Sequence, residues 1–298
     1  MGDLMGTRKF RRAGPLTQFT DTLRASVPRR RDGEPKESES ASADEVTDFT
    51  ALLARYMDLP ASVRLAQKIA TIPSVDVPKG AGAAPNAGGM IVAHVRDRVR
   101  ELEEAISRAC TLAVKRRTNT LAPDQMYGIV QENGLLVARD EAVMARTCQS
   151  AWEPFRFFFE RQVERLSFEI DDIRNEIGPV IAAMGRRAAK LERLDAAMVE
   201  VVTEARAAWV QTITALMFEA FAANYDAAVR ALTEGSTLSD IVAWYEPGGW
   251  VADHFLLQEK ALHAILTHSH KFVSGLVSSA IEAGAASELS SSRIAVWS

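Results

Sequence analysis

Apolar residues recur every three or four positions over residues 188–234, a segment without glycine or proline. The average step is roughly 3.6 residues, the period of a straight α-helix, so one apolar stripe runs along the whole segment. With a rise of about 1.5 Å per residue, this helix is on the order of 65 Å long. A helix of this length favours a structural or partner-binding role over a catalytic one. The stripe consists of Leu191, Leu194, Met198, Val202, Ala205, Trp209, Ile213, Leu216, Ala220, Ala223, Ala227 and Ala231.

Helical spacing also predicts long helices at residues 90–117, 152–177 and 250–283. Residues 140–150 form a further helical segment that either joins the second long helix or stops just before it. The Gly178-Pro179 pair is expected to kink or interrupt that helix, because proline lacks a backbone donor and clashes with the preceding turn.

The segments between these helices carry turn residues instead. Residues 118–134 contain Asn119, Pro123, Gly128 and Gly134 and are predicted to form an irregular turn, and Gly235 is predicted to end the long helix. The short apolar alternation that is typical of strands is missing. The predicted fold class is therefore all-α, an elongated and coiled-coil-like bundle of long antiparallel helices.

Composition divides the chain into five parts. Residues 1–43 are rich in Arg, Ser, Glu, Pro and Gly and are predicted to be a disordered basic arm. Residues 44–72 are predicted to be a short helical pair, and residues 73–89 a linker rich in Pro, Gly and Ala. Residues 90–285 form the long-helix bundle, and residues 286–298 are expected to be a flexible tail.

The charge of the chain is distributed unevenly. The net charge of −4 gives no general indication of nucleic-acid binding, but the segment 8–31 holds eight basic residues and one acidic residue. This arm is either a solubilising tail or a flexible electrostatic arm for nucleic acid or an acidic partner. The basic residues 115–117 end a helix, where the helix dipole alone explains them. The candidate nucleic-acid-binding residues are Arg8, Lys9, Arg11, Arg12, Arg29, Arg30, Arg31, Lys115, Arg116 and Arg117.

Four phenylalanines fall within five residues of the second long helix. One helix cannot direct all four toward a single core, since Phe155 and Phe159 share the apolar stripe whereas Phe157 points away from it. Either the helix is sandwiched between two neighbours, or part of the cluster is an exposed aromatic patch that binds a partner protein. The candidate partner-binding residues are Phe155, Phe157, Phe158, Phe159 and Trp209.

Catalytic and metal-binding signatures are weak. The sequence has no phosphate-binding G-x-x-x-x-G-K-[ST] motif and no G-x-S-x-G motif. His263, His268 and His270 are separated by five and two residues. Two histidines of one helix bind the same metal ion when they are three or four residues apart, and this pattern does not provide that spacing. We therefore expect no metal and no cofactor.

The carboxylates of an acidic cluster share one face of the second long helix. Glu169 and Asp172 lie three positions apart, and Asp172 and Glu176 four, as a two-carboxylate site requires. Arg165 and Arg174 are near enough along the helix to act as ion-pair partners, so a solvated helix face is the simpler interpretation. A cryptic nuclease or hydrolase site at these carboxylates remains the alternative.

The chain has two cysteines, Cys110 and Cys148, which are too few for a disulfide framework or a cysteine-based metal site. This favours the reducing cytosol, and the alternative is a single disulfide between the two. No stretch approaches about 18 consecutive apolar residues, as a membrane-spanning helix requires. The N-terminus lacks the apolar core of a secretory signal, although its arginine-rich start also fits a transit peptide. We expect a cytoplasmic protein without direct membrane insertion.

The chain contains several characteristic segments, namely the helical pair around residues 49–70, Trp152-Glu-Pro-Phe-Arg, Ile177-Gly178-Pro179, Leu191-Glu-Arg-Leu-Asp-Ala-Ala and Gly249-Trp250. In these segments the sequence resembles the bacterial domain of unknown function 3348 family. The resemblance covers residues 44–283 and includes no catalytic motif. It implies a likeness to the F accessory component of type III Zorya anti-phage systems, whose genes lie beside those of a stator-like membrane motor.

The resemblance implies a non-enzymatic defence component that binds a second cytosolic protein encoded nearby and is functionally linked to the motor. The surplus of apolar stripe agrees with this, because long helices often bury excess apolar surface against another chain. Nucleic acid is a further candidate ligand, and a homo-oligomer is also compatible. The alternatives are a DNA-binding effector that uses the arginine-rich arm and a purely structural helical scaffold.

Overall fold

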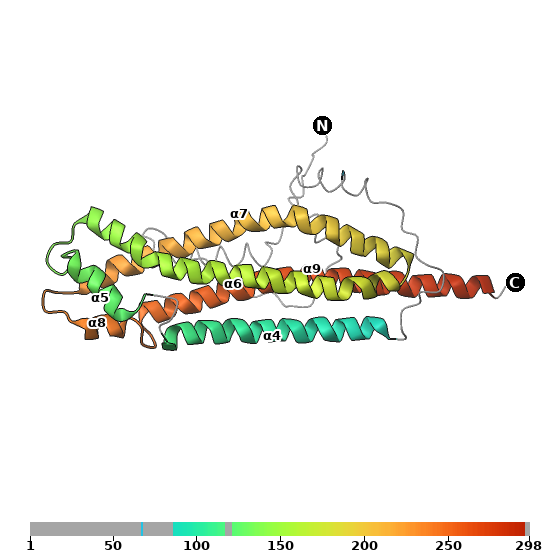
Figure 1. Cartoon of the computed structure of the whole chain (residues 1–298), viewed down its shortest axis with the longest axis horizontal. Helices are drawn as coiled ribbons and strands as arrows, with labels where there is room; N and C mark the ends of the chain where they lie inside the picture. Colours follow the sequence, from blue (N-terminus) through green and yellow to red (C-terminus); the bar gives the residue numbers. More distant parts are fainter. Residues whose placement is uncertain (1–66, 68–85, 117–120, 296–298) are drawn as a thin grey trace, which may run out of the picture.

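The computed structural model describes residue 67 and residues 86–116 and 121–295. Within these ranges every regular element is a helix, which confirms the predicted all-α class. The long helices are α4 (Ala87–Arg116), α6 (Glu141–Ala183), α7 (Arg186–Ala231) and α9 (Trp250–Ala295). The short helices α5 (Pro123–Glu132) and α8 (Leu238–Ala243) pack together at one end of the molecule (Figure 1).

The long helices form an elongated bundle in which successive rods run in opposite directions (Figure 1). Helices α6 and α9 pack on each other, α7 packs on both of them, and α4 packs on both from the other side. This is the up-down-up-down arrangement of a four-helix bundle. The C-terminal part of α9 extends beyond the other rods (Figure 1).

The buried face of α6 follows the predicted stripe closely. Its fully buried large side chains recur with helical spacing and include Phe155, Phe159, Ile170, Ile173 and Ile177. Because the stripe faces both α7 and α9, it removes apolar area from water along the whole rod, at about 25 cal/mol for each Å².

The predicted stripe of α7 is correct in its middle and wrong at its end. Met198, Ile213 and Leu216 are buried as expected, but Ala227 and Ala231 are exposed. The last turns instead bury Phe221, Tyr225 and Val229. Large side chains remove more apolar area from water than alanine does, so they decide which face turns inward.

Two predicted helix boundaries also differ from the structure. Helix α6 is continuous from residue 141 to residue 183 and is not interrupted at Gly178-Pro179. Pro179 removes only the hydrogen bond to the carbonyl of Asn175, an exposed residue whose carbonyl water can satisfy. Helix α7 ends at Ala231, ahead of the expected stop at Gly235, and its C-cap Leu232 is extended.

The segment predicted as an irregular turn, residues 118–134, contains helix α5. Pro123 occupies its first turn, where a missing donor costs nothing, and the Gln125 side chain accepts a hydrogen bond from the Ala122 amide at 3.0 Å.

The bounds of the first and last long helices also differ from the prediction. Helix α4 begins at Ala87, inside the predicted linker, and α9 continues to Ala295, through most of the predicted tail. The predicted arm (residues 1–43) and, except for residue 67, the predicted helical pair lie outside the described residues.

Gly249 closes the connection between α8 and α9. A Cβ atom at this position would lie 2.4 Å from the backbone oxygens of both Ala243 and Trp244. The backbone is this close because the amide of Gly249 donates to the Glu246 carbonyl at 2.8 Å and that of Val251 donates to the Trp244 carbonyl at 3.0 Å. Only glycine fits here without moving the backbone.

We expect Gly249→Ala to lower the free energy of unfolding by about 1–3 kcal/mol, because backbone oxygens cannot rotate away from the added methyl group. Urea unfolding monitored by circular dichroism measures the change. The control is Gly235→Ala, at a glycine whose added Cβ would meet nothing within 4 Å. Its stability should stay within about 0.5 kcal/mol of the wild type, and equal losses in both variants would contradict the steric explanation.

Candidate partner-binding surfaces

The structure divides the predicted phenylalanine cluster. Phe155, Phe158 and Phe159 are buried, and the ring centroids of Phe155 and Phe221 lie 5.2 Å apart. The Phe157 side chain is 55% exposed, with the Arg156 guanidinium 4.8 Å from the centre of its ring. The sandwiched-helix alternative therefore describes three of the four residues, and Phe157 alone among them is available to a partner.

Trp209, the fifth predicted partner-binding residue, is half-buried at the contact between α7 and α9. Its ring centroid lies 4.8 Å from that of His268 in an edge-on arrangement. This geometry makes Trp209 a packing residue within the bundle and leaves less of its ring for another chain.

His254 lies in an aromatic cage in the core. Its ring centroid is 5.3 Å from those of Trp152 and Phe221 and 5.8 Å from that of Phe155. Burial lowers the pKa of His254 to about 3, so the imidazole is neutral at physiological pH. It therefore packs as part of the core.

The acidic cluster is a partly exposed helix face that also joins two helices. Arg98 of α4 places its Nη2 atom 3.2 Å from Glu169 and 3.1 Å from Asp172 on α6. His94 lies 2.6 Å from Glu176. Arg174 contacts Asp171 at 3.4 Å, whereas the second expected partner, Arg165, makes no ion pair with the cluster in the described part of the chain. Arg98 of α4 thus pairs with two of the carboxylates that sequence spacing brought together.

A small polar cavity lies among α6, α7 and α9. Its volume is about 20 Å³, which is enough for one water molecule and too small for a substrate. Asp195 and Arg174, which line it, form an ion pair at 3.3 Å, and burial raises the pKa of Asp195 in spite of that pair. Burial also lowers the pKa of Arg206 on the same wall.

Ser107, Glu259 and His263 bring a hydroxyl, a carboxylate and an imidazole together between α4 and α9. The Ser107 hydroxyl donates to Glu259 Oε1 at 2.6 Å and lies 3.3 Å from His263 Nε2. In a catalytic triad the carboxylate contacts the ring nitrogen that faces away from the nucleophile. Here Glu259 approaches the same nitrogen, at 3.8 Å, so the group is a polar clamp between helices. Residue spacing could not reveal this group, because Ser107 and His263 are 156 positions apart.

Both cysteines are free and buried. Burial raises the pKa of Cys110 to about 12 and that of Cys148 to about 11, with smaller contributions from Glu259 and Asp226 respectively. A nucleophilic thiol requires a shift in the opposite direction. Within the described residues, no three His, Cys, Asp or Glu side chains come close enough to share a metal ion.

A surface pocket of about 310 Å³ lies between the first turns of α6 and the last turns of α7. We call it the α6–α7 pocket. It is lined by Glu141, Met144, Ala145, Cys148, Phe218, Ala222, Tyr225, Asp226 and Arg230. Most of its wall is apolar, and burial raises the pKa of Tyr225 to about 12, so the phenol there remains uncharged. The rim carries two acidic groups and one basic group, and Arg230 is paired with Asp226 at 2.8 Å.

Sequence reasoning missed this pocket. Its walls come from helices far apart in the chain, and the α7 stripe was assigned to alanines in place of Tyr225. The available signal was the pair of small residues Ala145 and Ala222 among large neighbours, because small side chains on facing helices leave space between them.

Of the predicted nucleic-acid-binding residues, the structure describes the side chain of Lys115, which is exposed near the end of α4. For Arg116 only the backbone is described, and the remaining candidates lie outside the described residues.

None of the described helices is both apolar enough and long enough to cross a bilayer.

A family model with the description "Protein of unknown function (DUF3348)" matches residues 36–280, most of the chain. The chain belongs to the DUF3348 family. The family predicted from the sequence strings is thereby confirmed, and the match extends from before α4 into α9. No curated protein and no solved structure matches this DUF3348 member.

His254 predicts a pH dependence of stability. Below its ordinary pKa of 6.5 the unfolded chain binds a proton on this imidazole, whereas the folded chain does not until the pH nears 3. Stability is therefore lost as the pH falls through this window, by about 2 kcal/mol between pH 6.5 and pH 5. The His254→Leu variant removes the titrating group and should lose about 2 kcal/mol less than the wild type over that range.

Urea unfolding at pH 7 and pH 5 measures both losses. The other titrating groups are common to the two proteins, so their effects cancel in the comparison. Parallel pH profiles for wild type and His254→Leu would contradict the assignment of a neutral, buried imidazole.

Proposed function

We propose that this chain is a non-enzymatic, cytosolic binding component of a bacterial anti-phage defence system similar to type III Zorya. In this proposal it binds a second cytosolic defence protein encoded nearby and is functionally linked to a stator-like membrane motor. The observation that carries the binding role is the α6–α7 pocket. The defence context is only what the resemblance to the type III Zorya component implies.

The chemistry of the α6–α7 pocket favours one kind of ligand. Phe218, Ala222 and Met144 offer an apolar surface of the kind that accepts the anchor side chains of an amphipathic helix. Since Asp226 is already paired with Arg230, Glu141 leaves the rim with an unbalanced negative charge. The expected ligand is therefore a helical segment with an apolar face and a neighbouring lysine or arginine.

The observed groups support binding over catalysis. The two thiols have raised pKa values, Arg98 pairs with two carboxylates of the acidic cluster, and Ser107 faces the carboxylate of Glu259. The alternatives remain a DNA-binding effector that uses the arginine-rich arm and a purely structural scaffold.

Ala145→Arg tests the proposal, because this exposed residue lines the pocket and a long cationic side chain there would cover its floor and repel a basic ligand. Co-expression with the protein encoded by the neighbouring gene should yield a complex for the wild type. Ala145→Arg should weaken that complex at least ten-fold, about 1.4 kcal/mol, as measured by isothermal titration calorimetry.

The control is Ala142→Arg, which adds the same side chain at an exposed position of α6 that does not line the pocket. It should bind as the wild type does. The proposed function is wrong if the wild type does not associate with the neighbouring gene product, and the pocket is the wrong surface if both arginine variants bind equally.

A further inference from the structure

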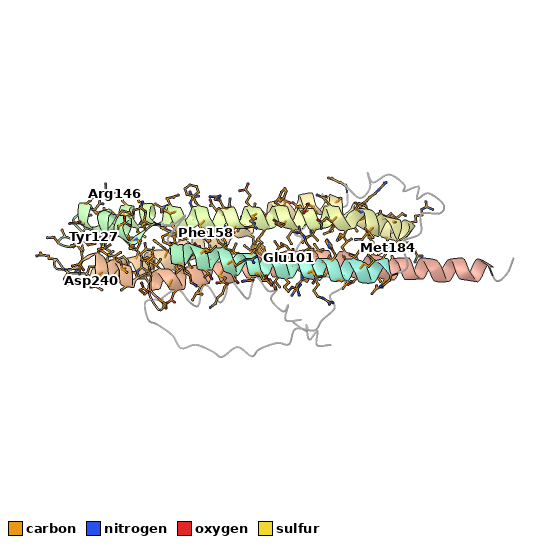
Figure 2. All side chains as sticks on the ribbon, turned by 60° about the horizontal axis from the view of Figure 1, so that its bottom comes forward. Glu101, Tyr127, Arg146, Phe158, Met184 and Asp240 are labelled. Carbon is orange, nitrogen blue, oxygen red and sulfur yellow. The ribbon has the colours of Figure 1, made fainter. Side chains whose placement is uncertain are left out.

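The outer face of α6 carries two exposed aromatic side chains. Phe157 is 55% exposed and Phe168 is 72% exposed. Eleven positions correspond to about three helical turns, so the two rings lie on the same face, about 16 Å apart along the axis. Figure 2 shows the side chains of α6, with Arg146 and Met184 labelled toward its two ends and the buried Phe158 between them.

Arg161 and Glu164 occupy this face between the two phenylalanines, and both are exposed. The four positions are separated by steps of four, three and four residues, the spacing of a seam along which one helix packs against another. We call Phe157, Arg161, Glu164 and Phe168 the α6 seam. It lies opposite the buried stripe of α6, which packs against α7 and α9.

We propose that two copies of the chain associate through the α6 seam, with their α6 helices antiparallel about a two-fold axis between residues 162 and 163. Phe157 of each copy then lies against Phe168 of the other, at both ends of the contact. Between these aromatic pairs, Arg161 of each copy faces Glu164 of the other. A two-fold interface requires such a self-complementary surface.

The charges of the α6 seam also set the direction of the two helices. A parallel alignment would instead bring Arg161 against Arg161 and Glu164 against Glu164, which is repulsive. The order of charges along the α6 seam thus selects both the partner, a second copy, and its direction.

The α6 seam does not fit the other classes of partner as well. Its one positive and one negative side chain give it no net charge, whereas nucleic-acid surfaces require an excess of positive charge. Aromatic and arginine side chains are the residues that contribute most to protein interfaces. The seam shares no residue with the α6–α7 pocket, so this inference stands independently of the proposed function.

Charge exchange within the full-length chain tests the dimer. Arg161→Glu places glutamates against each other at two symmetry-related points, and Glu164→Arg does the same with arginines. Each variant should raise the dimer dissociation constant at least ten-fold in sedimentation-velocity experiments. The double variant Arg161→Glu, Glu164→Arg should restore dimerisation, because the exchanged charges again face opposite charges.

Two further variants complete the experiment. Phe168→Ala should also weaken the dimer, because it removes an aromatic contact at both ends. Lys260→Glu, a charge reversal at an exposed position of α9, should leave the dimer unchanged, and circular dichroism should show the same helicity in every variant.

A wild type that stays monomeric at about 100 µM would overturn the proposal. So would single variants that dimerise normally, or a double variant that does not recover. If seam variants abolish binding to the neighbouring gene product without changing the mass of the isolated chain, the seam binds that protein and not a second copy.

Discussion

The fold depends on burying one continuous apolar face of α6 between two other rods. Phe155 of this face contacts Phe221 of α7 and Phe255 of α9, at centroid distances of 5.2 and 5.4 Å. A single helix could not bury this face by itself. Helices in proteins gain most of their stability from packing an apolar face against neighbouring elements. The same burial keeps His254 neutral and both thiols protonated, so the core that holds the rods together also limits the chemistry available inside it.

Polar groups align the rods at the edges of this core. Arg98 joins α4 to α6, Arg174 joins α6 to α7, and the hydroxyl of Ser107 joins α4 to Glu259 of α9. Apolar stripes tolerate sliding of one helix along another, whereas a hydrogen bond or close ion pair is satisfied at one position only. We interpret these contacts as fixing the longitudinal alignment of the bundle.

Periodicity predicted the helices and the fold class because a helix repeats every 3.6 residues whatever it packs against. It failed where the result depends on another helix. The buried face at the end of α7 follows the large residues Phe221 and Tyr225, and the cation that neutralises Asp172 comes from α4 and not from Arg165. The α6–α7 pocket was hidden for the same reason, because a space between two helices is a property of neither sequence segment alone.

The two proposed surfaces lie on the same helix and would act together. A two-fold axis near residue 162 lies about sixteen residues, or about 24 Å along α6, from the pocket residues Ala145 and Cys148. Antiparallel pairing therefore places the two pockets of a dimer at opposite ends of the contact, about 50 Å apart along α6. A partner with two linked helical segments could fill both pockets only if its linker spans that distance, and it would then gain affinity through effective concentration without new contacts. Dimerisation through the α6 seam would thus select partners by length as well as by the chemistry of each pocket.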